Sequence, residues 1–391
     1  MIDFDMTLPT RLIFGRKKEE SVGKIIKEYG YQKILFVYGG GSIKSNGLYE
    51  TVVAKLKEEG IEFIELGGVT SNPDVSFVTK GLELIRKEPV DFILAVGGGS
   101  VIDVSKSIAD NFYYDGDPLD FNKQKAKPVK ALPLGCILTL ASAGSETSSS
   151  CVISDYQNHF KGGYNSETHR CLFAIEDPEL TYSAPKYQVG AGIIDMMMHS
   201  MERYFSQSDD NQLCDDFALS LCRNVVVAAR KLLTDPFDYD ARAQIMLASS
   251  LAHNDLTHIG KYRDAWYIHP LEHAVSAYDP KVTHGAGIGV LYLGWAKFIC
   301  HLDYPKFARF ARVVFDVHEQ NDEKAAIIGI TEMRKFYLSL GMPTTLKELG
   351  IKESDIPSIV KLASGNGTRV IGHYPQPLEA KDIESVYRLC L

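Results

Sequence analysis

Apolar positions follow two alternating patterns in the first half of the chain. Short runs rich in β-branched and aromatic residues are typical of buried strands, and they occur at 33–38, 63–66 and 91–96. Between them, residues 46–59 and 74–87 repeat apolar side chains at helical spacing. This alternation of strand and helix predicts a mostly parallel sheet covered by helices on both faces.

The pattern changes after Pro185. Before this residue, further strand candidates lie at 137–140, 151–154 and 171–175. After it, long helical patterns follow at 211–232 and 240–258. We therefore predict an α/β, Rossmann-like nucleotide-binding domain over residues 1–186 and an all-α helical domain over residues 187–391.

Two glycine triplets each end a predicted strand, in Tyr38-Gly-Gly-Gly-Ser42 and Val96-Gly-Gly-Gly-Ser100. Glycine lets the backbone approach a phosphate closely, and a helix that begins next offers free N–H groups. Neither triplet follows the GxGxxG pattern, so tight turns without a ligand are the alternative. Two such turns at the carboxyl ends of parallel strands favour phosphate binding. Ser100 is the expected N-cap of the helix that follows the second triplet, and Asp103 lies three residues later.

A stretch rich in hydroxyl groups, Thr139–Thr147, follows another predicted strand. Its side chains are candidates for contacts with a pyrophosphate or a ribose. Taken alone, however, the stretch is more typical of a serine-rich loop.

One carboxylate and several histidines form the strongest chemical pattern. Asp195 and His199 are four residues apart, as are His269 and His273, so each pair shares one face of a helix; His284 follows. Asp195 lies among apolar residues, and a buried carboxylate is costly unless a cation or hydrogen bonds compensate it. A carboxylate with two or three imidazoles and no thiolate suits Fe²⁺, Zn²⁺, Mn²⁺ or Ni²⁺. A single histidine is more often structural, and we assign no role to histidines 159, 169, 253, 258, 301, 318 and 373.

Composition narrows the functional classes. The 391 residues carry 42 Lys and Arg against 50 Asp and Glu, and this net charge of −8 disfavours a nucleic-acid partner. No apolar run reaches the length of a membrane helix, and the first residues lack the features of a signal peptide. Seven scattered cysteines without a CxxC pair favour reduced thiols in a cytoplasm and disfavour a cysteine-based zinc site.

Together these residues resemble the iron-containing (group III) alcohol dehydrogenase family, in particular its butanol dehydrogenase and broad aldehyde reductase branch. The resemblance runs through nearly the whole chain. It is carried by the following motifs: Pro9–Gly15, Tyr38–Ser42, Asn72-Pro73, Val96–Asp103, Gly144–Thr147, Asp177-Pro178, Asp195 with His199, and His269 with His273 and His284-Gly285.

The resemblance implies a dehydroquinate synthase-like fold, bound NAD(P), a small alcohol or aldehyde substrate such as butanol or butanal, and a homodimer. It implies that Asp195, His199, His269 and His284 hold one divalent metal, with Fe²⁺ favoured, and that His273 relays a proton near the substrate. The positions that match cofactor contacts are Gly40, Gly41, Ser42, Gly98, Gly99, Ser100, Asp103, Thr139, Ser142 and Lys161.

One departure from the family pattern concerns His269. The interval from His269 to His284 is fifteen residues, one more than usual, and the usual interval would place Pro270 at the ligand position. Proline cannot ligate a metal, so His269 is kept as the predicted ligand.

NADP(H) is the favoured cofactor. An acidic side chain beyond an early strand commonly binds the ribose 2′-hydroxyl of NAD and would repel a 2′-phosphate. Here the turn after Tyr38 carries no carboxylate until Glu50, and Lys44 adds a positive charge.

Other functions remain open at this stage. A dehydroquinate synthase-like or glycerol dehydrogenase-like enzyme would share the fold and the metal, but a sugar-phosphate lyase needs cationic side chains, whereas the stretch Trp266–Ile268 is apolar or aromatic. A metal-dependent hydrolase would not need two glycine turns. A non-catalytic nucleotide sensor would leave the metal ligands without a purpose.

Overall fold

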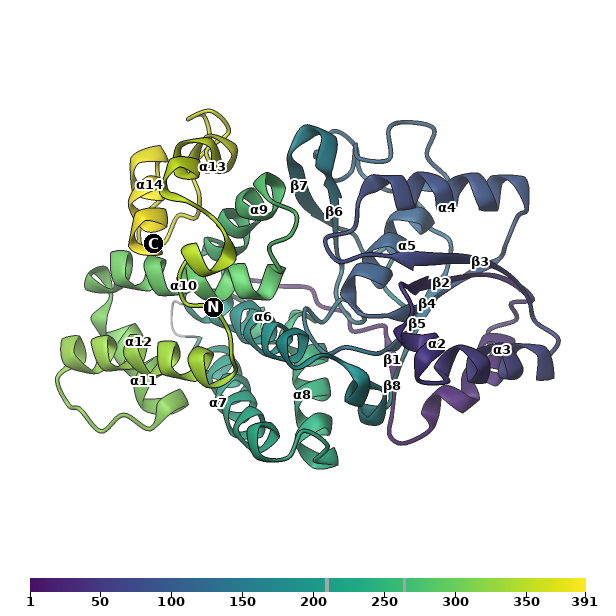
Figure 1. Ribbon diagram of the computed structural model, residues 1–391, viewed down its shortest axis with the longest axis horizontal. Coiled ribbons are helices and arrows are strands. Elements are labelled where there is room, and N and C mark those ends of the chain that lie inside the picture. Colours follow the sequence, from purple (N-terminus) through teal and green to yellow (C-terminus); the bar gives the residue numbers. More distant parts are fainter. Residues whose placement is uncertain (208–210, 263–264) are drawn as a thin grey trace. The chain divides into compact units, whose positions relative to one another are not determined.

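The computed structural model describes residues 1–207, 211–262 and 265–391 (Figure 1). The chain divides into two compact units, one formed by residues 7–184 and the other by residues 1–6 together with 185–391. The units therefore divide between residues 184 and 185, close to the boundary expected after residue 186, and the first six residues belong with the helical unit.

A parallel sheet forms the centre of the first unit. Among the described residues it has six strands in the order β1-β8-β5-β4-β2-β3, and every neighbouring pair runs parallel. The strands are β1 (Arg11–Phe14), β2 (Lys33–Gly39), β3 (Glu62–Val69), β4 (Phe92–Gly97), β5 (Leu134–Leu138) and β8 (Phe173–Glu176). The apolar runs of β2, β4 and β5 are buried because helices cover both faces of the sheet.

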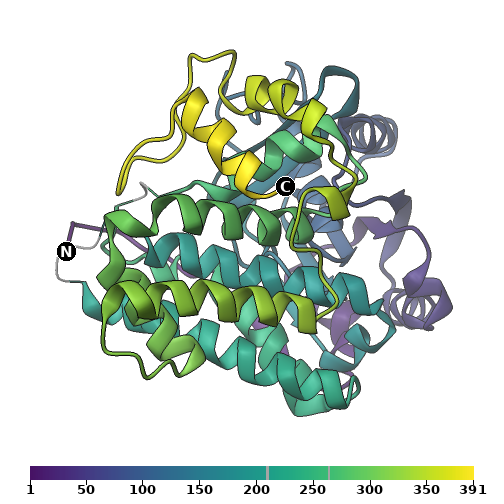
Figure 2. The same cartoon turned by 60° about the vertical axis from the view of Figure 1, so that its left-hand side comes forward.

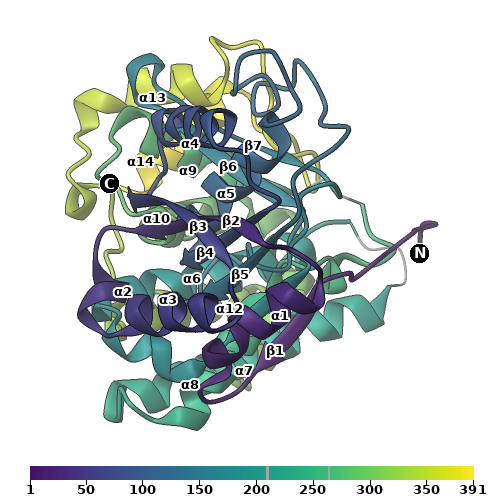
Figure 3. The same cartoon turned by 90° about the vertical axis from the view of Figure 1, so that its right-hand side faces the viewer.

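Figure 3 shows α4 and α5 on one face of the sheet and α1, α2 and α3 on the other. These helices are α1 (Val22–Glu28), α2 (Ser42–Ser45), α3 (Leu48–Glu58), α4 (Val75–Lys87) and α5 (Gly99–Asn111). A separate antiparallel hairpin pairs β6 (Ser150–Asp155) with β7 (Phe160–Asn165). The strand expected at residues 151–154 therefore exists, but it lies outside the parallel sheet.

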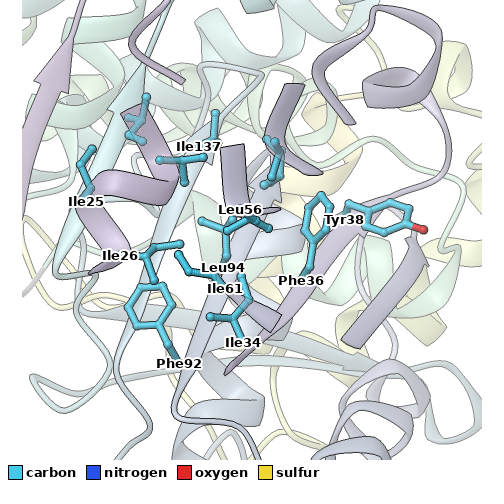
Figure 4. Packing of buried hydrophobic residues seen from close by; sticks show 14 of the residues in the cluster. Ile25, Ile26, Ile34, Phe36, Tyr38, Leu56, Ile61, Phe92, Leu94 and Ile137 are labelled. Atoms are coloured by element: carbon cyan, nitrogen blue, oxygen red, sulfur yellow. The ribbon is translucent and has the colours of Figure 1, made fainter. Parts of the chain in front are cut away.

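One hydrophobic cluster joins the sheet to helices α1, α2 and α3. Phe36 and Leu94 from the strands pack with Ile26 and Leu56 from the helices, and none of the four is exposed to solvent (Figure 4). A fully buried side chain of this size stabilises the fold by roughly 1.5–3 kcal/mol. This core fixes the positions at which β2 and β4 end.

Helices make up the second unit. They are α6 (Lys186–Tyr204), α7 (Gln212–Thr234), α8 (Tyr239–Ala252), α9 (Ile268–Tyr278), α10 (His284–Ile299), α11 (Tyr304–Phe315), α12 (Asp322–Ser339), α13 (Ile356–Ala363) and α14 (Ala380–Leu389). Within this unit α6 packs against α7 and α10, and α11 packs against α12 (Figure 2). The predicted combination of a parallel α/β unit and a helical unit is confirmed.

One described helical segment, His284–Leu302, is long and apolar enough to cross a membrane by length and composition alone. This corrects the expectation that no run reaches that length. However, 78% of its most apolar window is buried inside the protein, which is typical of a core helix.

Candidate metal centre and cofactor turns

Helix α6 supplies the first two candidate ligands. Asp195 and His199 are one helical turn apart, and they are only 3% and 4% exposed. The surrounding turns of α6 are almost entirely buried, so water does not solvate this carboxylate. The predicted helical pair is therefore present, and it lies inside the helical unit.

Two further histidines come from α9 and α10. His269 lies in the first turn of α9 and is 7% exposed, and His284 is the first residue of α10. Helix α10 lies unusually close to α6, because a Cβ atom placed on Gly285 would be 2.1 Å from the carbonyl oxygen of Ala191. This close approach brings His284 towards Asp195.

The four side chains converge on one carboxylate oxygen. Asp195 Oδ1 lies 3.5 Å from His199 Nε2, 3.7 Å from His269 Nε2 and 4.0 Å from His284 Nε2. Donor atoms bound tetrahedrally to one metal ion at about 2.1 Å would be about 3.4 Å apart. The observed spacing is therefore slightly wider than a metal shell.

The buried polar atoms of this cluster also fit a metal ion. His269 Nε2, which faces Asp195, is buried and makes no hydrogen bond within the described parts of the chain. Such atoms normally have a partner, because an unsatisfied buried polar group is costly. One carboxylate and three imidazoles form a donor set suited to Fe²⁺, Zn²⁺, Mn²⁺ or Ni²⁺.

The protein affects the pKa of two of these histidines in opposite directions. Burial lowers the pKa of His199 well below its ordinary value, and the neighbouring His253 and His269 lower it further. Burial also acts to lower the pKa of His269, but the charge of Glu202 and the contacts with Asp195 outweigh it and raise that pKa to about 9. At neutral pH this pKa leaves the metal-free His269 protonated on both ring nitrogens, and metal binding at Nε2 would release the proton on that atom.

Several residues that sequence reasoning left without a role surround this cluster. The imidazole of His253 stacks on that of His199, with ring centroids 3.9 Å apart, and Trp266 packs edge-on against His269 at 5.2 Å. The carboxylates of Glu202 and Glu272 accept hydrogen bonds from Nδ1 of His269 and His284 respectively. The only sequence signal for them was position, since Glu202 follows His199 by three residues and Glu272 precedes His273.

His273 lies next to the cluster, as the sequence predicts. It follows His269 by one helical turn on α9, and its ring centroid is 5.6 Å from that of His284. His273 is half-buried. Together with Glu272 and His284 it places ligand-type atoms within 4.8 Å of one another.

The two glycine turns lie at the same edge of the first unit's sheet. Gly40 and Gly41 follow β2, Gly98 and Gly99 stand at the end of β4, and β2 and β4 are neighbours. After β2 the chain continues to β3, on one side of this pair, and after β4 it continues to β5, on the other side. The two turns therefore flank the point where the strand order reverses. Ligands of parallel α/β sheets bind at such a point.

Space is available at the first turn. A Cβ atom placed on Gly40 or Gly41 would have no other atom within 4 Å, and Ser42 is exposed at the start of α2. At the second turn, Gly98 is the N-cap of α5 and no side chain caps this helix. Ser100 therefore lies inside the helix, so the expectation that it is the N-cap is wrong; glycine takes that position.

The remaining predicted cofactor residues lie around the second turn and the hairpin. The Thr139 N–H donates to Gly97 O at 3.0 Å, and Ser142 is half-buried in the loop after β5. The Asp103 carboxylate accepts hydrogen bonds from Ser145 Oγ and from the Val152 N–H, so in this structure it holds the loop and the hairpin.

Two lysines have different surroundings in this unit. Lys161, on β7, donates to Asn72 Oδ1 at 3.0 Å. Lys106, which sequence reasoning did not single out, is fully buried on α5 and donates to the carbonyls of Ser145, Ser148 and Ser150. Its ammonium group therefore fixes the shape of the loop next to the second glycine turn.

Family comparisons agree with this arrangement. Residues 9–178 match the family model described as iron-containing alcohol dehydrogenase, and residues 190–391 match the C-terminal model of the Fe-containing alcohol dehydrogenase family. These two matches cover most of the chain.

Individual relatives extend over the whole length. The chain is 40% identical to NADH-dependent butanol dehydrogenase A of Clostridium acetobutylicum, covering 99% of both chains. It is 32% identical to the NADPH-dependent aldehyde reductase YqhD of Escherichia coli, covering 95% of each. The crystal structure of NADH-dependent butanol dehydrogenase A from Thermotoga maritima superposes with a TM-score of 0.96 at 33% identity, covering 100% of this chain and 99% of that one.

Proposed function

The chain belongs to the iron-containing alcohol dehydrogenase family, and on that premise we propose that it is an NAD(P)-dependent oxidoreductase that interconverts primary alcohols and aldehydes. The observation that carries this proposal is the convergence of three imidazole Nε2 atoms within 4.0 Å of Asp195 Oδ1. Butanol and butanal are the proposed type of substrate, because relatives at 37–40% identity are named butanol dehydrogenases.

We assign Asp195, His199, His269 and His284 as the metal ligands, with Fe²⁺ as the favoured ion. When bound, a divalent ion supplies Lewis-acid chemistry, which polarises a carbonyl oxygen and lowers the pKa of an alcohol hydroxyl. These ligands contribute a single negative charge from Asp195 and otherwise neutral imidazoles. With a divalent ion bound, the site would keep a net positive charge, which would stabilise negative charge on the substrate oxygen.

We assign His273 the transfer of the proton. Aldehyde reduction requires a hydride at the carbonyl carbon, which a reduced nicotinamide supplies, and a proton at the carbonyl oxygen. His273 is one helical turn from His269 on α9, and its partial exposure to solvent supports this role. An imidazole with an ordinary pKa of about 6.5 can both give and take a proton near neutral pH.

The two glycine turns are the proposed binding site for the cofactor phosphates, with Gly40, Gly41, Ser42, Gly98, Gly99 and Ser100 as contacts. Backbone N–H groups at the start of α5 and the open space at Gly40 support this assignment. Asp103, Thr139, Ser142 and Lys161 are the further proposed contacts.

NADP(H) is the proposed preference over NAD(H). The Lys44 ammonium lies over the rings of Tyr38 and Tyr49, with 5.1 Å and 4.7 Å to the centroids, at the end of β2. Glu65 lies nearby on β3, but its two carboxylate oxygens already accept hydrogen bonds from the hydroxyl groups of these tyrosines. The relatives include both an NADH-dependent and an NADPH-dependent enzyme.

A cytoplasmic homodimer is the proposed setting. All seven cysteines are free and buried, which agrees with a reducing compartment. The dimer rests on the family resemblance alone.

The experiment that tests the proposed function is a substrate panel. The purified, metal-loaded protein is mixed with NADPH or NADH and with butanal, short aldehydes, dihydroxyacetone or a sugar phosphate, and absorbance at 340 nm is followed. We expect oxidation of the cofactor with butanal. No oxidation with any aldehyde would overturn the proposal, and turnover of only dihydroxyacetone would point to the glycerol dehydrogenase type.

A further inference from the structure

Two buried carboxylates lie directly behind the imidazoles of the metal cluster. Glu202, on α6, contacts Nδ1 of His269 through Oε2, and Glu272, on α9, contacts Nδ1 of His284 in the same way. The two glutamates are 5% and 0% exposed. Carboxylates are rarely buried to this extent unless they have specific partners.

Glu202 is held by a second set of contacts. Its Oε1 accepts hydrogen bonds from the backbone N–H groups of Tyr267, Ile268 and His269, at the start of α9. Tyr267, the N-cap of α9, offers no capping side chain, so Glu202 satisfies the N–H groups of this helix from α6. The same carboxylate thus fixes both the first turn of α9 and the imidazole of His269.

Glu272 is held in a different way. Its Oε1 accepts the hydroxyl of Ser276, one turn later on α9. The facing residue on α10 is Gly287, where a Cβ atom would lie 2.9 Å from Glu272 Cγ and 3.2 Å from its Oε1. The absence of a side chain at position 287 therefore leaves room for the carboxylate under His284.

These contacts decide which nitrogen each histidine presents to the cluster. A neutral imidazole whose Nδ1–H donates to a carboxylate has its lone pair at Nε2, and its ring cannot rotate freely. The Nε2 atoms of both histidines are the ones that face Asp195 Oδ1, at 3.7 and 4.0 Å. His199 has no such carboxylate, and its Nδ1 has no hydrogen bond among the described residues.

We propose that Glu202 and Glu272 are positioning residues, which hold His269 and His284 in the tautomer and orientation that bind the divalent ion. This inference rests on the proposed metal centre, but not on the identity of the substrate. An alternative is that Glu272 is itself a ligand of a second ion with His273 and His284, whose atoms lie within 4.8 Å. The direct contact of Glu272 with His284 Nδ1 leaves no room for an ion between them, and this favours positioning.

The test measures the metal affinity of the whole chain of 391 residues. Wild type, Glu202→Gln and Glu272→Gln are stripped with a chelator, and the Kd for Co²⁺ is measured by competition with a chromophoric chelator, together with stoichiometry and the visible Co²⁺ spectrum. Glu384→Gln on α14, paired with Arg388 on the surface, is the matched control. We expect Kd to rise about 10- to 100-fold in both variants with an altered spectrum, and to remain unchanged in the control.

Three results would overturn the inference. They are a Kd within twofold of wild type in both variants, an equal loss of affinity in the control, and a fall from two bound ions to one in Glu272→Gln. Because Glu202 also caps α9, its variant is checked for folding by circular dichroism, and Glu272→Gln decides the matter if Glu202→Gln does not fold. If Kd for Co²⁺ rises in the two glutamate variants as expected but the wild type turns over no aldehyde, the proposed function is refuted and this inference stands.

Discussion

His199 and His269 share one proposed task but differ in their surroundings. Burial and neighbouring imidazoles keep the pKa of His199 low, whereas Glu202 and Asp195 raise that of His269 to about 9 despite its burial. His199 is therefore ready to bind a cation in the metal-free protein, whereas His269 must first lose a proton. Two histidines in one cluster thus differ in protonation because their neighbours differ.

The separation of ligand and proton relay gives a prediction for His273. We expect His273→Ala to retain one metal ion per chain and to lose turnover by about 10²-fold near pH 7, because proton transfer by a positioned side chain contributes about this much. Metal content by elemental analysis and kcat for butanal are the measurements. His318→Ala, whose side chain is 87% exposed, is the control. Loss of the metal from His273→Ala, but not from His269→Ala, would show that the ligand register is shifted.

The sequence predicted the side chains that meet at the cluster, but not those that support them. Asp195 and His199 could be paired because one helix holds both at a spacing of four residues. Glu202 and Glu272 could not be identified, because a charged residue within a helical pattern normally faces water. His253 was likewise missed, since its stacking on His199 depends on the packing of α8 against α6.

Helices α6 and α10 bring Asp195 and His284 together because Gly285 lets the two helices approach closely. Gly285→Ala would place a Cβ atom 2.1 Å from the carbonyl oxygen of Ala191, so the helices would have to separate. We expect a loss of about 1–3 kcal/mol in the free energy of unfolding and weaker metal binding, measured by denaturant titration and by chelator competition. Gly40→Ala, where the new atom meets nothing within 4 Å, should change stability little. Unchanged stability and affinity in Gly285→Ala would contradict this explanation.

The turn after β2 carries the prediction on cofactor choice. We expect the wild type to have a higher kcat/KM with NADPH than with NADH. Gly40→Asp should reverse or abolish that preference, because its carboxylate would repel a 2′-phosphate and accept a ribose hydroxyl. Lys44→Gln is the companion variant and should weaken NADPH alone. Equal efficiency of both cofactors in the wild type would defeat the preference and leave the dehydrogenase function intact.

Elements with strong periodicity were predictable, and those set by tertiary contacts were not. The buried strands β2 and β4 and helix α4 appear close to their expected positions. Strand β1 has only four residues and two of them are exposed, so its sequence carries no clear alternation. Strand β7, with the sequence FKGGYN, contains two glycines, and it is a strand because it pairs with β6.

Stability of the molecule should depend on pH through Glu19. Burial, and then the neighbouring Asp177, raise the pKa of Glu19 to about 7, so the folded state holds this proton more tightly than the unfolded state. Its contribution to stability is complete below pH 4.5 and is lost as pH rises through 7. We expect Glu19→Gln to raise the free energy of unfolding at pH 8 by about 1–2 kcal/mol and to change it little at pH 5. The check is the Tm of the variant and of the wild type, compared at each pH. An equal effect at both pH values would contradict this assignment.

At the scale of the whole molecule, we infer that dehydrogenase activity depends on one divalent ion bound in the helical unit. The most direct measurement is a titration of the metal-free protein with Fe²⁺ under anaerobic conditions, in which butanal-dependent oxidation of NADPH is followed at 340 nm. We predict a rate that rises with added metal and levels off at one ion per chain, and no rise in His199→Ala. Full activity of the metal-free protein, or of His199→Ala without bound metal, would contradict this dependence on the ion.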